Sequence, residues 1–284
     1  DGHAGQVLDL AFAAEGQTLI SAGMDNHVKR WAVDAWTRVS TVVAHEKSVN
    51  AVALSPDGQT LVTGSSDTTV KLWRFPQMEL LHTLQDRKKV VSSVTTSDAG
   101  EWLAAASYGG RAVVWSLEGE EVVAIQASKK NLSSVAISPN RSLLVTAGLG
   151  GEINVWEIPS GAPLATLSGH QTAVSSLRFI TGGDQLVSLG YEGTIRLWRT
   201  GSWEEERVIA LDEPGARRLV MSPDEHRAAV SMEGRVQIWD AETWERAEGL
   251  DIGTKAVGGM AFSPDGAWFT AGGADGAIRI WATS

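Results

Sequence analysis

Residues 49–74 read VNAVALSPDGQTLVTGSSDTTVKLWR. Apolar and polar residues alternate in the first and last parts of this stretch, a pattern typical of half-buried β-strands. Between the first two runs lies Ser55-Pro56-Asp57-Gly58, where proline fixes φ and the following residues tolerate a tight reversal. The stretch therefore predicts three antiparallel strands, followed by a fourth: Val49 to Leu54, Thr60 to Gly64, Thr69 to Arg74 and Leu80 to Thr83.

The tryptophan that ends the third predicted strand recurs along the chain. Seven of the twelve tryptophans follow one another at intervals of 41 or 42 residues: Trp31, Trp73, Trp115, Trp156, Trp198, Trp239 and Trp281. A lone four-stranded sheet cannot bury both of its faces, so neighbouring units must stack, and radial closure removes the exposed ends of the stack. The sequence predicts an all-β fold, a seven-bladed propeller of four-stranded antiparallel blades that forms a single domain over residues 1–284.

Composition narrows the functional classes. A formal net charge of -10 argues against nucleic acid as a partner, because affinity for phosphate backbones comes largely from Lys and Arg. The chain contains no cysteine, which excludes disulfides and thiolate chemistry, and no apolar run of about 18 residues that predicts a membrane span. No signal peptide is visible, so we expect a cytoplasmic protein, and the missing initial Met leads us to expect a truncated N-terminus.

The repeats resemble those of the WD-repeat β-propellers over the whole chain, although only Trp239-Asp240 is a literal Trp-Asp pair. In that family, a blade carries a hydrogen-bonded set of His, Ser or Thr, Asp and Trp. The resemblance implies two complete sets here: His3, Ser21, Asp25 and Trp31 in blade one, and His45, Thr63, Asp67 and Trp73 in blade two. Blade five has Glu192 in place of Asp, and blades three and six lack the set.

Motifs for catalysis are scarce. The chain has no His-Glu-x-x-His, no Gly-x-Ser-x-Gly and no phosphate-binding Gly-x-x-x-x-Gly-Lys sequence. We expect a non-enzymatic scaffold without cofactor or metal that binds a protein or peptide, as the family resemblance also implies. We expect it to be the sensor or docking domain of a larger signalling protein. Two alternatives remain open: a hydrolase or lyase built around His82 or His226, and a lectin that stacks sugars on Trp36, Trp203 and Trp244.

One face of the propeller carries the candidate binding residues. The residue before the Asp position of each blade lies in an exposed turn, where small or polar side chains are usual. In five blades this residue is large and apolar or aromatic: Met24, Tyr108, Leu149, Tyr191 and Met232. We expect these five side chains to ring the mouth of the central channel as an exposed interface. The alternative is that they pack as lids over neighbouring loops.

Basic residues cluster in the loops that should share this face. They are Lys47, Lys88, Lys89, Lys129 and Lys130, with Arg217 contributing from blade six. Such a sector is suited to an acidic peptide or phosphopeptide, because charge attraction acts over a longer range than packing. The alternative is that these are ordinary solvated side chains on mobile loops.

Blade seven is expected to lack its outer strand. After its third strand, Ala277 to Trp281, only three residues follow in the sequence. We expect either a three-stranded blade, with the ring closed by side-chain packing between blades one and seven, or an outer strand donated from outside this chain. Strand addition of this kind is a common mode of recognition.

Overall fold

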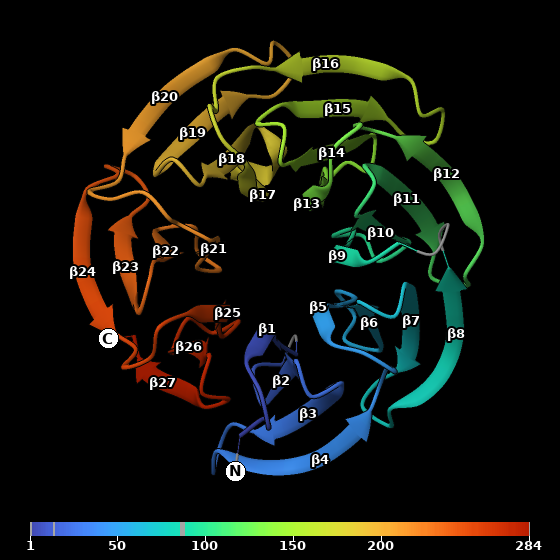
Figure 1. The fold of residues 1–284 in the computed structure, drawn as a ribbon, viewed down its shortest axis with the longest axis vertical. Coiled ribbons are helices and arrows are strands. Elements are labelled where there is room, and N and C mark those ends of the chain that lie inside the picture. The colour runs from blue at the N-terminus through green and yellow to red at the C-terminus, as the bar shows by residue number, and fades with distance from the viewer. Residues whose placement is uncertain (1, 14, 86–88, 284) are drawn as a thin grey trace.

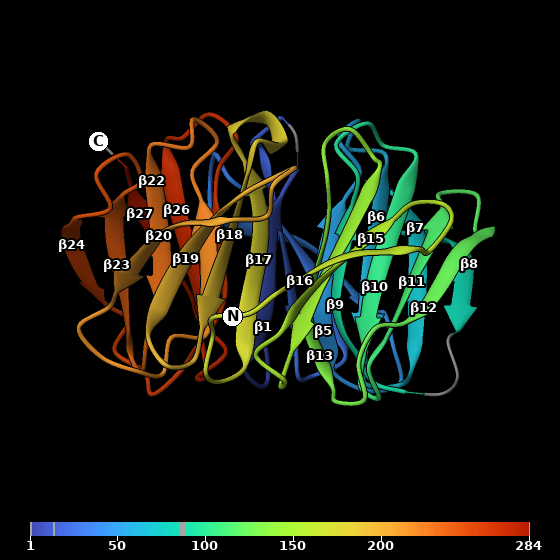
Figure 2. The ribbon, with the colours of Figure 1, turned by 90° about the horizontal axis from the view of Figure 1, so that it is seen from above.

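The computed structural model describes residues 2–13, 15–85 and 89–283, which form seven antiparallel sheets arranged radially around one axis (Figure 1). Seen from the side, the sheets make a flat disc (Figure 2). Six sheets have four strands and the seventh has three. Apart from one 3-10 turn, η1 (Thr181–Gly183), the regular structure of the described residues is β. The predicted seven-bladed propeller is confirmed.

Blades follow the chain order, four strands at a time, and within each blade the strands pair in sequence order. Blades one and two contain β1 (Val7–Phe12), β2 (Thr18–Gly23), β3 (His27–Ala32), β4 (Thr37–Val43), β5 (Val49–Leu54), β6 (Thr60–Ser65), β7 (Thr69–Arg74) and β8 (Glu79–Gln85). Blades three and four contain β9 (Val91–Thr96), β10 (Trp102–Ser107), β11 (Arg111–Ser116), β12 (Glu121–Gln126), β13 (Leu132–Ile137), β14 (Leu143–Gly148), β15 (Ile153–Glu157) and β16 (Pro163–Leu167). Blades five to seven contain β17 (Val174–Ile180), β18 (Gln185–Gly190), β19 (Thr194–Arg199), β20 (Glu205–Ala210), β21 (Arg218–Met221), β22 (Arg227–Ser231), β23 (Arg235–Asp240), β24 (Arg246–Asp251), β25 (Val257–Phe262), β26 (Trp268–Gly273) and β27 (Ile278–Ala282).

The hydrophobic core lies between neighbouring blades. Val62 and Leu72 of blade two, for example, belong to the same buried cluster as Leu103 and Val113 of blade three. The second strand of each blade is the most buried, whereas the fourth strand is largely exposed, as in β8. Stacking therefore buries both faces of each inner sheet, and the first strands are left to line the central axis (Figure 1).

A buried polar network links the strands of blade two. His45 Nδ1 lies 2.8 Å from Asp67 Oδ2, and His45 Nε2 lies 2.7 Å from Thr63 Oγ1, which also accepts the Trp73 ring N–H at 3.0 Å. Burial lowers the pKa of His45, so its ring is neutral at neutral pH. Because the ionised Asp67 carboxylate only accepts, His45 donates from Nδ1 and its Nε2 accepts the Thr63 hydroxyl proton.

The carboxylate at the end of this network is held in its ionised form. Burial alone would raise the pKa of Asp67, but hydrogen bonds from Thr69 and the neighbouring His45 lower that pKa to about 2. The same arrangement occurs in blade one, and in blade five with Glu192 as the acid: His3, Ser21, Asp25 and Trp31; His170, Ser188, Glu192 and Trp198. The two complete sets that the family resemblance implied are confirmed.

Blade six lacks this network, as expected. Ala229 occupies the position of the Ser or Thr, and Leu211 that of the His. Consequently the buried Trp239 Nε1 has no hydrogen-bond partner among the described residues, and the buried Gln237 amide also lacks one. An unpaired buried donor costs free energy, so blade six lacks the stabilisation that the network gives to blades one, two and five.

Blade seven has three strands among the described residues, as expected. Its first strand, β25, packs very closely on β1: a β-carbon at Gly258 would lie 1.9 Å from the Val7 carbonyl oxygen, and one at Gly259 would lie 2.5 Å from the Asp9 carbonyl carbon. Side-chain packing alone does not close the ring, because the His3 N–H also donates to the Gly276 carbonyl at 2.8 Å. Glycine is required at this junction.

Removing the acid from a complete network should destabilise the protein. We predict that Asp67→Ala lowers the free energy of unfolding by roughly 1 to 3 kcal/mol, because buried donors on His45 and Thr69 lose their acceptor. Chemical denaturation measures this change.

Asp275→Ala provides the matched control, because Asp275 holds the same position in blade seven but its side chain is bonded only to Arg279 and a turn N–H. We expect it to destabilise the protein distinctly less. Equal losses from both substitutions would contradict the assigned network.

Candidate binding site at the channel

The central channel opens on the face that carries the turns between the second and third strands. A cavity of about 530 Å³ follows the axis, and its lining includes Tyr108, Leu149 and Tyr191 from three such turns. A second recess of about 400 Å³ at the mouth is lined by Tyr108, Tyr191 and Arg217, together with Asn50 of β5. The aromatic side chains and the arginine therefore meet at one opening.

Four of the five expected mouth residues are exposed. The exposed fractions are 53% for Met24, 45% for Tyr108, 52% for Leu149 and 38% for Tyr191. Met24 is not part of the channel lining, because its side chain lies over Gly5 at the edge of blade one.

The expectation for Met232 is wrong. Its side chain is 2% exposed and packs in the core beside Trp239 and Trp244. In the other six blades, the backbone N–H at this position donates to the loop before the first strand, whereas Met232 N–H donates to Arg235 within its own turn. This different bonding accompanies the inward position of the Met232 side chain.

The described lysines of the expected basic sector lie in the loops that connect one blade to the next. Lys89 packs along Gly109, next to Tyr108, and Lys130 lies beside Gly150, next to Leu149. Lys47 and Lys129 are also exposed, and Lys88 lies outside the described residues. None of the described lysines lines the channel itself, so these charges are not part of the channel wall.

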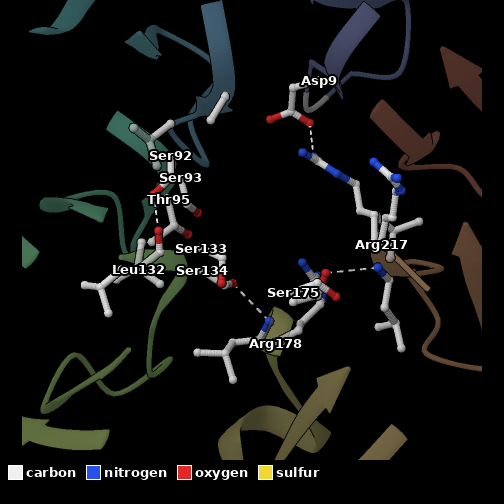
Figure 3. Close-up of a pocket in the computed structure, with 18 of the residues that line it drawn as sticks. Asp9, Ser92, Ser93, Thr95, Leu132, Ser133, Ser134, Ser175, Arg178 and Arg217 are labelled. Atoms are coloured by element: carbon white, nitrogen blue, oxygen red, sulfur yellow. Dashed lines mark hydrogen bonds and ion pairs between the residues drawn. The ribbon is translucent and has the colours of Figure 1, made fainter. Parts of the chain in front are cut away.

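The channel wall holds charged residues that the sequence analysis did not single out. Arg218 of blade six pairs with Asp9 of blade one, and Figure 3 shows Asp9 on the wall of this cavity. Asp9 also accepts the backbone N–H groups of Leu10 and Val52, each at 2.9 Å. Burial raises the pKa of Asp9, and Arg218 and the Val52 N–H oppose this shift. The available signal was a charged residue two positions after the buried apolar residue at the start of the innermost segment: Asp9 follows Val7, and Arg218 follows Ala216.

Polar side chains of the first strands join neighbouring blades along this wall. Each junction from blade one to blade six has at least one such bond to a backbone group. They are Asp9 Oδ2 with Val52 N at 2.9 Å, Asn50 Nδ2 with Val91 O at 2.8 Å, Ser92 Oγ with Leu132 O at 2.8 Å, Ser134 Oγ with Leu177 N at 3.0 Å and Ser176 Oγ with Leu219 N at 3.1 Å. The Arg218–Asp9 pair then spans blade seven, where Gly258 and Gly259 offer no side chain.

The tryptophans considered for sugar stacking are packed instead. Trp36 meets Trp268 edge-on with ring centroids 5.4 Å apart, Trp203 packs against a core cluster, and Trp244 is buried. All three have positive φ, as turn residues do. These contacts favour the packing interpretation over the lectin.

The described part of the chain contains no group of three or more His, Asp or Glu side chains placed to hold a metal ion. It also contains no helix long and apolar enough to cross a membrane.

Comparison with protein families agrees with this geometry. The family model described as WD domain, G-beta repeat matches residues 1–32, 36–74, 78–116, 119–157, 161–199 and 251–282. The chain belongs to the WD-repeat family. The unmatched stretch between residues 199 and 251 contains blade six, where the buried network is missing. No curated protein matches the chain significantly.

Proposed function

We propose that the chain is a non-catalytic scaffold that binds a protein or peptide on its channel-mouth face, as the docking domain of a larger signalling protein. The observation that carries this proposal is the exposure of Tyr108 and Tyr191 at the recess that also holds Arg217. WD-repeat propellers generally serve as platforms for protein interaction.

Tyr108 and Tyr191 are suited to anchor a binding partner. Tyrosine buries a large area at low conformational cost, and its hydroxyl remains able to pair with polar groups of a partner. Both tyrosines lie in short turns next to glycines, on the ends of paired strands. A partner would therefore meet a surface that is already formed, which lowers the entropic cost of binding.

Charge favours an acidic partner. Lys89 and Lys130 lie beside the turns that carry Tyr108 and Leu149, and Lys47 and Lys129 are exposed in corresponding loops, in a chain of net charge -10. Complementary charge at the edge of an interface mainly raises the association rate and makes it sensitive to salt. The proposed partner is thus a peptide segment with an apolar side chain that packs against Tyr108 and Tyr191. Asp, Glu or phosphorylated residues flank this side chain in the peptide.

A selection from a displayed peptide library tests the proposal. We predict that peptides selected on the wild-type chain lose at least tenfold in affinity, about 1.4 kcal/mol, with Tyr108→Ala or Tyr191→Ala. Lys89→Glu should slow association and flatten its dependence on salt. Titration calorimetry and stopped-flow mixing measure the two effects.

Val39→Ala is the control, because Val39 is more exposed than either tyrosine but lies on the outer strand β4. Selected peptides should bind this variant as they bind the wild type. Peptides that tolerate both tyrosine substitutions, or that are lost with Val39→Ala, would contradict binding at the mouth.

We propose a second contact at blade seven, where a strand from outside the described residues pairs with β27. Among the described strands, β27 pairs only with β26, and Ile278, Arg279, Ile280 and Trp281 are half-buried rather than covered. Unpaired backbone groups along such an edge are suited to strand addition.

Hydrogen exchange tests this second contact. We predict that amides at 277–281 exchange faster than those at 69–73 in β7, which is paired on both sides. Mass spectrometry of the isolated chain measures both segments. Equal protection in the absence of an added strand would show that the edge is not open.

A further inference from the structure

The wall of the channel is cationic, although the chain as a whole is acidic. The lining contains three arginines, Arg178, Arg217 and Arg218, against one carboxylate, Asp9. Asp9 is occupied by Arg218 and by two backbone N–H groups. Arg178 and Arg217 are exposed to the channel, and within the described part of the chain neither forms an ion pair with a carboxylate (Figure 3). The positive charges of Arg178 and Arg217 therefore remain available to bind an anion in the channel.

Hydroxyl groups add donors to the same channel wall. Ser93, Ser134 and Ser176 occupy the third position of the first strand in three adjacent blades. Ser134 and Ser176 each accept a backbone N–H from the next blade, so their own hydroxyl protons are still free to be donated. No described residue accepts a hydrogen bond from the Ser93 hydroxyl. The wall thus presents surplus donors and positive charge to the cavity.

We propose that the channel binds a compact phosphate-bearing anion. A phosphoryl group has several terminal oxygens that accept hydrogen bonds from different directions, which suits donors placed around a ring, and a guanidinium can grip two of these oxygens at once. Arg217 and Arg178 supply the charge-assisted bonds, and Ser93, Ser134 and Ser176 supply the neutral ones.

The size and the access of the cavity fit a small ligand. Its volume of about 530 Å³ lies in the range usual for small-molecule sites. Arg217, Arg218 and Ser92 line both this cavity and the recess at the mouth, so the ligand enters between Tyr108 and Tyr191. Low-dielectric walls of one sign of charge also concentrate oppositely charged ligands. This site lies beneath the peptide surface and does not depend on the proposed peptide.

Titration with pyrophosphate tests the proposal. The full chain should bind pyrophosphate saturably at one site by calorimetry at constant ionic strength. Arg217→Ala and Arg178→Ala should each weaken this affinity at least tenfold, and Ser93→Ala should weaken it by a smaller factor. Thermal denaturation checks that each variant is folded, and Arg217→Lys replaces Arg217→Ala if the latter unfolds, because it keeps the charge but loses the two-pronged grip.

Arg207→Ala is the matched control, because it removes the same charge from the exposed outer strand β20. It should bind pyrophosphate as the wild type does. Equal weakening in Arg207→Ala, or no saturable binding to the wild type, would overturn the proposal. Citrate that binds as tightly as pyrophosphate would overturn the phosphate class. A phosphoserine peptide that binds when pyrophosphate does not would overturn the small-molecule site.

Discussion

Seven sheets that share no backbone ladder must be held in a ring by contacts between them, and the inner wall of the channel supplies the most specific of these contacts. One first-strand side chain after another bonds to a backbone group of the next blade, from Asp9 to Ser176. Arg218 completes the circle by reaching Asp9 across blade seven. The two glycines of β25 leave room for this arrangement, because any side chain there would collide with β1.

This closure explains why two adjacent arginines have different environments. Arg218 is committed to Asp9, whereas Arg217 has no carboxylate partner among the described residues and faces the opening. The channel can therefore keep its ring closed and still present positive charge to a ligand. Rigid strands carry the wall, and short turns carry Tyr108 and Tyr191, a division typical of binding scaffolds.

Much of the fold could be predicted from the spacing of the seven tryptophans, because each repeat is one sheet and local pattern specifies it. The buried network of His45, Thr63, Asp67 and Trp73 followed from the family resemblance and is present. Met232 could not be placed, because its position depends on which carbonyl its N–H meets. The Asp9–Arg218 pair joins residues 209 positions apart, and no repeat-by-repeat pattern relates them.

A double-mutant cycle on Asp9→Ala and Arg218→Ala tests most directly whether this pair closes the ring. Denaturant unfolding of the wild type, both single variants and the double variant gives the coupling free energy. We predict coupling of at least about 1 kcal/mol, since Asp9 is buried and the contact is charge-assisted, and close to zero for the exposed pair Arg74 and Glu79. Strictly additive losses at Asp9 and Arg218 would contradict the claim that this contact closes the propeller.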